Sequence, residues 1–229
     1  MEAIILAGGL GTRLRSVVPD LPKPMAPVGG RPFLAWLLDT LVEAGFGRAV
    51  LAVSYRHEVI QGCFGERYRS LSLAYSVEPE PRGTGGAIRL ALGRIATPQV
   101  FVVNGDTWLD MDYAAMAAAH LAADARLSMA VAKVPDVARY GALALAGGRV
   151  RGFLEKGRAG PGAINGGVYL MATSLFDGFV LPEAFSFEAD FLMPHVSDLQ
   201  PLAVTAPGAF IDIGIPADYA RAQALLAGC

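Results

Sequence analysis

Short apolar runs alternate with longer segments of helical spacing in the first half of the chain. The runs occupy 2–7, 48–53, 71–77 and 99–103. Between them, 33–44 and 87–95 place apolar residues at the period of an α-helix. This alternation predicts a mostly parallel sheet with helices on both of its faces.

The second half of the chain changes pattern. Short strand-like pieces at 127–134, 142–145, 150–154 and 167–170 are separated by glycine turns, which predicts a mixed continuation of the same sheet. The alanine-rich stretch 114–125 reads as a surface helix. Pro216 suits the first turn of a closing helix over 217–226.

Length and composition favour one domain that acts on a small molecule. The 229 residues are 53% hydrophobic, enough for one large core in a single α/β domain over 1–229. The net charge is −2 with both signs interspersed, so neither a nucleic acid nor a membrane surface is indicated as a partner.

The cysteines and the hydrophobic segments point to a cytoplasmic location. The chain has only two cysteines, Cys63 and Cys229, and they are far apart in the sequence. This predicts neither a disulfide framework nor a zinc site, and a reducing compartment fits best. The apolar run at 3–7 is too short for a signal sequence, and no stretch reaches a membrane-spanning length. We therefore expect a soluble, cytoplasmic protein.

A glycine-rich loop follows the first apolar run. Gly8 Gly9 Leu10 Gly11 Thr12 Arg13 Leu14 is followed by Pro22 Lys23 Pro24. Glycines let backbone N–H groups approach an anion, and the loop adds a hydroxyl and positive charge, so it predicts a cradle for a triphosphate. Neither G-x-x-x-x-G-K-[ST] nor a complete G-x-G-x-x-G is present. An ordinary glycine-rich turn is the alternative.

Two aspartates are candidate metal ligands. Asp106 follows the apolar strand 100–103, at the strand end where open α/β sheets bind ligands, although a single aspartate also suits a turn. Asp212 interrupts the apolar run 210–215, where an unpaired charge is costly and a cation would offset it. Two aspartates suit Mg²⁺, which takes its other ligands from phosphate and water oxygens.

Three further segments carry polar residues at strand ends or before a helix. Glu155 and Lys156 follow one strand-like piece, and Asn165 and Gly166 begin another; a solvated charge pair and a turn are the alternative. The segment 80–87 leaves backbone available to a base edge or, alternatively, only caps a helix.

Taken together, these motifs resemble the sugar-1-phosphate nucleotidyltransferases. The matching segments are G-x-G-T-R-L at 9–14, P-K-P at 22–24, E-P-x-G-T-G-G-A from Glu80, G-D at 105–106, R-Y-G at 139–141, E-K at 155–156, N-x-G-x-Y at 165–169 and D-x-G-x-P at 212–216. Ser16, Gly157 and Ile215 depart from the residues usual in the family.

The resemblance implies a fold and a reaction. It implies an α/β, Rossmann-like (GT-A-like) nucleotidyltransferase with a mixed, mostly parallel central sheet flanked by helices. Residues up to about 110 would form the nucleotide-binding half, and residues from about 111 to 229 the sugar-phosphate-binding half. The reaction would join a nucleoside triphosphate and a sugar 1-phosphate into a nucleotide sugar and pyrophosphate, by in-line attack without a covalent enzyme intermediate.

The resemblance also assigns roles to residues. It implies nucleotide binding by Leu6, Ala7, Gly8, Gly9, Gly11, Thr12, Arg13, Lys23, Glu80, Gly83, Thr84, Gly85 and Asp106. It implies sugar-phosphate binding by Tyr140, Gly141, Glu155, Lys156, Asn165 and Gly166. It supports Mg²⁺ on Asp106 and Asp212, with Arg13, Lys23, Asp106 and Lys156 carrying catalysis.

Within the family, the chain is most similar to the D-glycero-α-D-manno-heptose 1-phosphate guanylyltransferases, notably over 21–27, 104–107, 164–169, 185–188 and 211–219. The expected partners are then GTP and a heptose 1-phosphate, and the product would serve a surface glycan. Mannose 1-phosphate, or a uridylyl or thymidylyl transfer to another sugar phosphate, is the alternative. A non-catalytic sugar-nucleotide sensor is the alternative from another class, and a homo-oligomer is left open.

Overall fold

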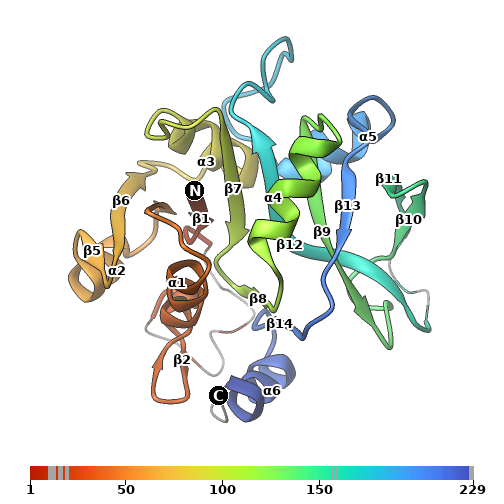
Figure 1. The fold of residues 1–229 in the computed structure, drawn as a ribbon. Coiled ribbons are helices and arrows are strands. Elements are labelled where there is room, and N and C mark those ends of the chain that lie inside the picture. The colour runs from red at the N-terminus through yellow and green to blue at the C-terminus, as the bar shows by residue number, and fades with distance from the viewer. Residues whose placement is uncertain (10–13, 15–17, 19–20, 156, 158, 227–229) are drawn as a thin grey trace.

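A ten-stranded sheet forms the centre of the molecule (Figure 1). The computed structural model describes residues 1–9, 14, 18, 21–155, 157 and 159–226. The strand order is β10-β11-β13-β9-β12-β7-β1-β4-β6-β5. The bounds are β1 Glu2–Leu6, β4 Arg48–Val53, β5 Arg67–Tyr68, β6 Leu71–Val77, β7 Gln99–Asn104, β9 Leu127–Val134, β10 Leu143–Ala146, β11 Arg149–Phe153, β12 Gly162–Ala172 and β13 Leu202–Thr205.

The sheet is mixed, and most of its strands run in one direction. Strands β6, β4, β1 and β7 are mutually parallel, and β9, β13 and β10 share their direction. Strands β5, β11 and β12 run the opposite way. The fold class expected from the sequence is therefore confirmed. The longest strand, β12, lies between β7 and β9 and joins the two parts of the sheet.

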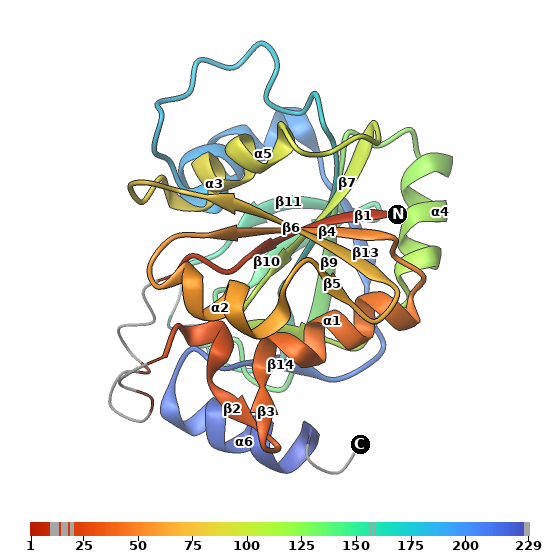
Figure 2. The ribbon, with the colours of Figure 1, turned by 90° about the vertical axis from the view of Figure 1, so that its left-hand side faces the viewer.

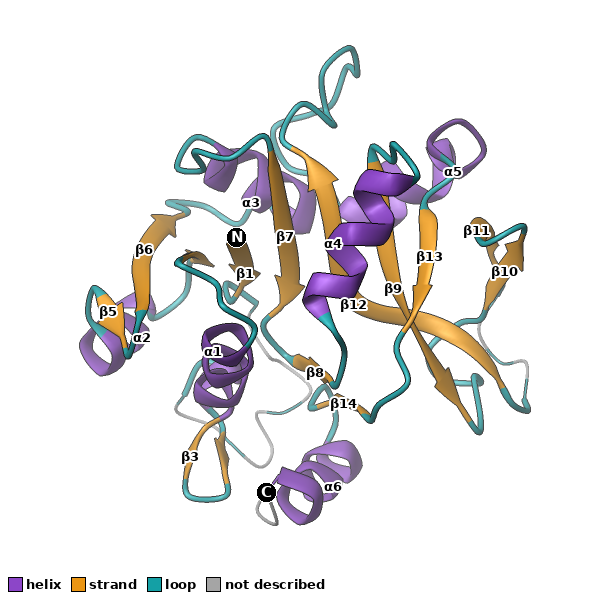
Figure 3. Ribbon diagram, in the orientation of Figure 1, coloured by secondary structure: helices purple, strands orange, loops and turns teal. Residues whose placement is uncertain are grey.

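Helices cover both faces of the sheet (Figures 2 and 3). Helices α3 (Gly83–Leu92) and α5 (Met193–Leu199) lie on one face, with the π-helix η2 (Phe187–Leu192). Helices α1 (Phe33–Glu43), α2 (His57–Phe64) and α4 (Tyr113–Ala122) pack on the other face. Successive residues of β1 point to opposite cores, Ile4 to the first and Ala3 and Ile5 to the second, which is why an uninterrupted apolar run specifies this doubly covered strand.

Smaller elements complete the structure below the sheet in Figure 2. They are the short helix η1 (Lys23–Met25), the hairpin β2 (Pro27–Val28) and β3 (Arg31–Pro32), the pair β8 (Thr107–Leu109) and β14 (Phe210–Asp212), and the closing helix α6 (Pro216–Leu226). Helix α6 contacts both β14 and β2. None of the helices in the described part of the chain has the length and apolarity needed to cross a membrane.

The structure also corrects the sequence prediction in several places. Helix α3 begins at Gly83, four residues before the predicted 87, and the predicted helix 114–125 is observed as Tyr113–Ala122. Several elements were not predicted, among them α2, η2, α5 and β13. Strand β13 pairs in parallel with β9, although only four half-buried or exposed residues form it.

Candidate active site

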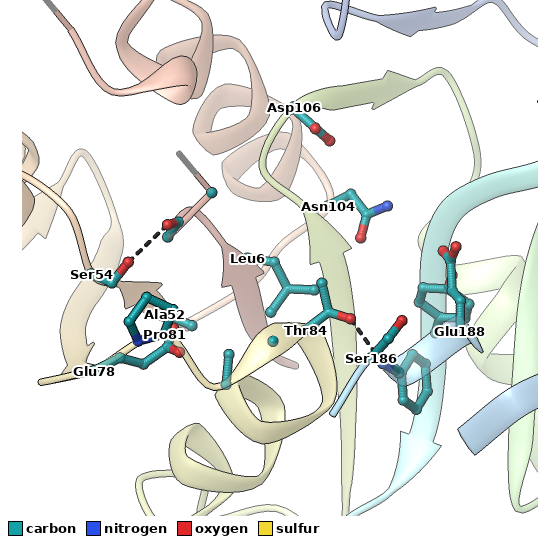
Figure 4. Close-up of a pocket in the computed structure, with 16 residues that line it drawn as sticks. Leu6, Ala52, Ser54, Glu78, Pro81, Thr84, Asn104, Asp106, Ser186 and Glu188 are labelled. Atoms are coloured by element: carbon teal, nitrogen blue, oxygen red, sulfur yellow. Dashed lines mark hydrogen bonds between the residues drawn. The ribbon is translucent and has the colours of Figure 1, made fainter. Parts of the chain in front are cut away.

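The site lies where the carboxyl ends of β1 and β7 meet. Leu6 pairs with Asn104 at the end of the two parallel strands, and Gly105 N–H donates to the Leu6 carbonyl at 3.0 Å. A pocket of about 370 Å³ opens at this point (Figure 4). It is lined by Leu6, Gly8, Gly9, Ala52, Ser54, Glu78, Pro81, Gly83, Thr84, Ala87, Asn104, Asp106, Tyr169, Ser186, Phe187 and Glu188.

The structure brings the two predicted metal ligands together. Strands β8 and β14 pair antiparallel, with Asp212 opposite Thr107, and Ile213 N–H donates to the Asp106 carbonyl at 3.0 Å. Lys23, at the start of η1, makes an ion pair with Asp106, and its Nζ lies 3.8 Å from Asp212 Oδ1. One buried ammonium group therefore joins two carboxylates that come from distant parts of the chain.

The electrostatics of this cluster suit a divalent cation. Lys23 is 9% exposed, so its charge is poorly screened by water. Burial raises the pKa of the Asp212 carboxyl, and the neighbouring Asp106 adds to this effect because the two negative charges repel each other. Among the described residues, no group of three or more His, Cys, Asp or Glu side chains is placed so that it could hold a metal ion. Two carboxylates fit Mg²⁺ where phosphate and water oxygens complete its ligands.

One end of the pocket holds a second buried acid, Glu78. Its Oε2 accepts the Arg82 N–H at 2.8 Å, and Ser54 Oγ donates nearby to the Gly8 carbonyl at 2.8 Å. Burial raises the pKa of the Glu78 carboxyl, although the hydrogen bond and the charge of Arg82 oppose the rise. In Figure 4, Glu78 lies beside Ala52 and Pro81, far from Asp106.

The opposite end of the pocket is formed by Tyr169 and Glu188, and Asn165, which does not line the pocket, is hydrogen-bonded to both. The Tyr169 hydroxyl donates to Glu188 Oε1 at 2.6 Å, and Asn165 Nδ2 donates to the same oxygen at 2.8 Å. Burial raises the pKa of Tyr169 well above its usual value, and the charge of Glu188 raises it further, so the phenol stays protonated and donates. Glu188 therefore has a fixed position, and none of the described residues donates a hydrogen bond to its second oxygen, Oε2, which can accept from a ligand.

Local irregularities of the backbone position this second end. The ladder between β12 and β9 shifts register between Asn165 and Tyr169, and a β-bulge of this kind re-aims side chains next to many active sites. Glu188 lies in the π-helix η2, a rare conformation that is frequent at functional sites. Phe187 N–H donates to Thr84 Oγ1 at 2.8 Å, which joins η2 to the start of α3 across the pocket.

Several predicted nucleotide-binding residues do line the pocket, whereas others do not. Leu6, Gly8, Gly9, Gly83, Thr84 and Asp106 are in its wall, and Lys23 contacts Asp106. Ala7 and Gly85 do not line it, and their N–H groups donate to the Ala52 and Phe185 carbonyls at 2.8 and 2.9 Å. Glu80 is exposed and outside the lining, and Glu78 occupies the wall instead. Gly11, Thr12 and Arg13 lie outside the described residues.

The predicted sugar-phosphate residues are also divided. Asn165 joins the Tyr169–Glu188 network, but Gly166 is buried against Leu109 and Ala130. Glu155 is exposed and does not line the pocket. Lys156 lies outside the described residues.

Tyr140 lines a second hollow of about 360 Å³, which it shares with Lys133, Arg139 and Arg221. Its hydroxyl lies 3.5 Å from the buried carboxylate of Asp218. Gly141, the next residue, lines neither hollow among the residues described. The placement of Tyr140 and Gly141 in the pocket of Figure 4 is thus not observed.

Sequence reasoning gave no site role to several polar residues of the pocket wall, among them Ser54, Glu78 and Glu188. Ser54 and Glu78 are isolated polar side chains with no spacing pattern of their own, whereas Glu188 ends the matching segment 185–188. Ser54 and Glu78 do share one signal, because each is the first residue after a parallel strand, β4 or β6, at the edge where α/β sheets bind ligands.

Comparison with known proteins shows the family. The chain matches the nucleotidyl transferase family model over residues 2–228, and it belongs to that family. It is 44% identical over 223 residues to D-glycero-alpha-D-manno-heptose 1-phosphate guanylyltransferase of Aneurinibacillus thermoaerophilus, with 97% of each chain covered. It is 40% identical over 220 residues to the protein of the same name from Campylobacter jejuni, which covers 96% of this chain and 97% of that one.

A solved structure agrees with these relatives. HddC from Yersinia pseudotuberculosis, in a crystal structure complexed with GMP-PN, superposes with a TM-score of 0.88 at 38% sequence identity. The match covers 98% of this chain and 99% of that chain. The family expected from the sequence motifs is thus confirmed.

Proposed function

We propose that the protein joins GTP and D-glycero-α-D-manno-heptose 1-phosphate into GDP-heptose and pyrophosphate. The main observation that supports this reaction is that Asp106, Lys23 and Asp212 lie together beside the pocket. Relatives at 44% and 40% identity over nearly the whole chain carry this activity in their names, which supports the choice of base and sugar.

In this reaction the sugar phosphate oxygen attacks the α-phosphorus of GTP in line with the departing pyrophosphate. Lys23 would neutralise charge on the phosphates, because its ammonium group lies at the edge of the pocket with little competing water. Arg13 and Lys156 would act on the triphosphate and on the attacking phosphate; these two roles rest on the sequence motifs alone.

Asp106 and Asp212 are the residues that would hold Mg²⁺, which supplies charge neutralisation to the phosphates when it is bound. Sugar hydroxyls would exchange hydrogen bonds with the network of Asn165, Tyr169 and Glu188, which would both accept from them and donate to them. Pocket shape holds both substrates in reach of each other, so positioning supplies a large part of the rate.

The setting of the reaction is part of the same proposal. With two cysteines and no disulfide framework, the chain suits the reducing cytoplasm, where it would supply an activated heptose for surface polysaccharide synthesis. We propose no nucleic-acid or membrane partner, because the charges are balanced and interspersed. Homo-oligomer formation stays a prediction for a sizing measurement.

The test is pyrophosphate release with Mg²⁺ and GTP, comparing the heptose 1-phosphate with mannose 1-phosphate in one series. Release that strongly favours the heptose supports the proposal. Release with mannose 1-phosphate alone keeps the chemistry and overturns the sugar. Release only with UTP, dTTP or CTP overturns the choice of guanine as the base. No release with any pair of substrates favours the hypothesis of a non-catalytic sugar-nucleotide sensor.

A further inference from the structure

The segment that leads into η2 lies along helix α3 and continues into the pocket wall. It runs from Leu181 to Ser186 without helix or strand, and the η2 residues Phe187 and Glu188 follow it. Ser186, Phe187 and Glu188 line the pocket. In Figure 2 this segment belongs to the loop that rises above α3 and α5 and returns beside α3. The contacts that hold it on α3 therefore affect the wall that contains Glu188.

Arg89, in α3, holds this segment by its backbone. Its Nη1 donates to the Leu181 carbonyl at 3.3 Å, and its Nη2 donates to the carbonyls of Pro182 and Glu183 at 2.7 and 3.1 Å. Its Cζ also lies 5.2 Å from the centre of the Phe185 ring. Three successive carbonyls therefore turn toward one cation, and the segment curves around it.

The bonding of Arg89 differs from that of a surface arginine. None of the salt bridges among the described residues includes it. A planar guanidinium presents five N–H donors in a fixed fork, so two of its nitrogens can bind three carbonyls at once, whereas an ammonium group presents its donors from one point. Arg89 is half-buried, which strengthens these hydrogen bonds. The side chain thus suits the holding of a backbone segment.

A second contact holds the same segment one helical turn away. Gly85 and Arg89 are four residues apart and lie on one face of α3. Phe185 N–H donates to the Arg82 carbonyl at 2.9 Å, and Gly85 N–H donates to the Phe185 carbonyl at 2.9 Å. The Phe185 ring is buried, and a Cβ on Gly85 would overlap it. The segment is therefore held at two points, which sets its direction as it enters the pocket wall.

Glu188 depends on this segment for its place. It lies three residues beyond Phe185, and Phe187 between them donates its N–H to Thr84 Oγ1 at 2.8 Å. Its side chain is held from the opposite wall, where the Tyr169 hydroxyl donates to Glu188 Oε1 at 2.6 Å. The backbone attachment to α3 and the side-chain attachment to β12 together determine where the carboxylate stands. A change on the α3 side therefore displaces it relative to β12.

We infer that Arg89 is a positioning residue for the sugar 1-phosphate: by holding the segment 181–185 on α3, it sets where Glu188 presents its carboxylate. This inference rests on the proposed function. Arg89 lies outside the pocket lining that the described residues form, so it acts through the segment and does not touch a substrate. A second candidate for the same task is the salt bridge of Arg82 with Glu183, at 2.7 Å. The Glu183 side chain is 72% exposed, and an exposed ion pair of this kind contributes little.

The experiment measures the KM for the sugar 1-phosphate and the KM for GTP in Arg89→Met, which keeps an unbranched apolar stem and removes the donors. We expect the KM for the heptose 1-phosphate to rise by about tenfold, the effect of losing one hydrogen bond to a charged group, and the KM for GTP to stay within about twofold. A variant that is only less stable loses active protein, which lowers the apparent kcat and changes neither KM. An unchanged KM for the sugar 1-phosphate in an active variant would overturn the inference.

Two further variants serve as controls. Glu183→Gln is the matched control: it breaks the exposed pair with Arg82 but leaves the Glu183 carbonyl for Arg89, so both KM values should equal those of the wild type. Arg89→Lys keeps the charge without the fork, so its KM for the sugar 1-phosphate should lie between those of the wild type and Arg89→Met. An equal rise in Glu183→Gln and Arg89→Met would overturn the assignment to Arg89.

A double variant tests the route through Glu188. If Arg89 acts through Glu188, the loss of both side chains should have no more effect than the loss of one. Arg89→Met combined with Glu188→Gln should then raise the KM for the sugar 1-phosphate by about tenfold, whereas independent effects would multiply to about a hundredfold. A multiplied effect would show that Arg89 acts by another route and would overturn the inference.

Calorimetric binding of the heptose 1-phosphate separates this inference from the proposed function. Wild type that binds the sugar phosphate, loses affinity by about tenfold in Arg89→Met and yet releases no pyrophosphate supports the positioning role and overturns the enzyme proposal. Wild type that turns over both substrates while Arg89→Met keeps the wild-type KM does the reverse. Neither binding nor turnover by the wild type overturns both.

Discussion

Asp212 lies directly opposite Thr107 in the antiparallel pair of β14 and β8, and this register sets the position of two acidic side chains. Asp106, one residue before Thr107, is thereby held beside Asp212, with the Lys23 ammonium between them. Neither strand belongs to the large sheet. The small two-stranded sheet therefore serves to join the end of β7 to a distant acidic residue at the mouth of the pocket.

The first prediction concerns the two aspartates. Asp106→Asn and Asp212→Asn should each lower Mg²⁺-dependent turnover by about a hundredfold or more, because an amide holds a divalent cation far less well than a carboxylate. Pyrophosphate release over a Mg²⁺ titration checks this. The control is Asp177→Asn, an exposed turn residue outside the pocket, which should behave as wild type. Near-normal Mg²⁺-dependent release from either variant would remove that aspartate from the mechanism.

The second prediction concerns Lys23 and thermal stability. Lys23→Met leaves Asp106 and Asp212 facing each other without their shared cation, so the Tm measured without Mg²⁺ should fall by about 2–4 °C, the equivalent of about 1 kcal/mol in a chain of this size. Adding Mg²⁺ should raise the Tm of the variant more than that of the wild type, since a divalent cation replaces the lost charge. Equal Mg²⁺ effects on both proteins would contradict this explanation.

The sequence predicted the fold where burial is continuous along the chain. Both faces of the sheet are covered at β1, β4, β7 and β9, so the sequence of each of these strands contains an apolar run. Strand β13 could not be found in this way, because it owes its place to pairing with β9 and contributes only partly buried or exposed residues. Helix α2 begins after Arg56, whose left-handed φ of 53° is no usual helix signal.

Site residues could be predicted from the sequence where they belong to a motif, such as a glycine-rich loop or a charged segment. They could not be predicted where a single side chain joins the pocket wall without a motif around it. The glycines after β1 and the aspartates at 106 and 212 belong to patterns that extend over several residues. Glu78 is a single acid, and Glu188 ends a matching segment without an assigned role; only the three-dimensional arrangement shows that both face one cavity. The predicted role of Tyr140 stays a prediction: its motif resembles the family, and its ring packs edge-on against Phe210 in a second hollow.

The third prediction separates the two ends of the pocket. Glu188→Gln should raise the KM for the sugar 1-phosphate by about tenfold, since a neutral amide accepts hydrogen bonds from hydroxyls less strongly than a carboxylate. Tyr169 and Asn165 keep an acceptor in this variant, so the wall stays in place. The KM for GTP, measured on the same protein, is the internal control and should not change. An effect confined to GTP would move Glu188 to the nucleotide.

The fourth prediction tests the packing of α3 against the loop before η2. A Cβ on Gly85 would overlap the buried ring of Phe185, so Gly85→Ala should lower the free energy of unfolding by about 1–3 kcal/mol. Gly62→Ala is the matched control. Gly62 is an exposed helix residue with no atom near the added Cβ, and the change should raise stability by about 0.5–1 kcal/mol.

Urea unfolding of both glycine variants measures the difference. Because Phe185 lies in the same segment as the pocket residues Ser186 and Phe187, Gly85→Ala should also weaken nucleotide binding, whereas Gly62→Ala should not. Two variants of equal stability would show that the loop moves aside at no cost.

The fifth prediction concerns acid stability. Glu2 Oε2 accepts hydrogen bonds from Ala96 N–H and Thr97 N–H, both at 2.8 Å, and from Thr97 Oγ1 at 2.9 Å. Burial acts to raise the pKa of this carboxyl, but the hydrogen bonds and the charge of Arg48 outweigh it and hold the pKa below its ordinary 4.5. The ionised form is thus the one that fastens β1 to the segment before β7.

A pKa that is lower in the folded state gives a stabilisation that is present above the unfolded value and is lost as the pH falls through the folded value. Glu2→Gln should therefore lower the free energy of unfolding by about 1–2 kcal/mol near neutral pH, the range for a hydrogen bond to a charged group. As the pH drops below 4.5, the gap between wild type and variant should close, because protonation of Glu2 makes the two side chains equivalent in charge. Urea midpoints between pH 3 and 7 measure this gap, and a gap that stays constant over that range would show that Glu2 contributes through shape and not through charge.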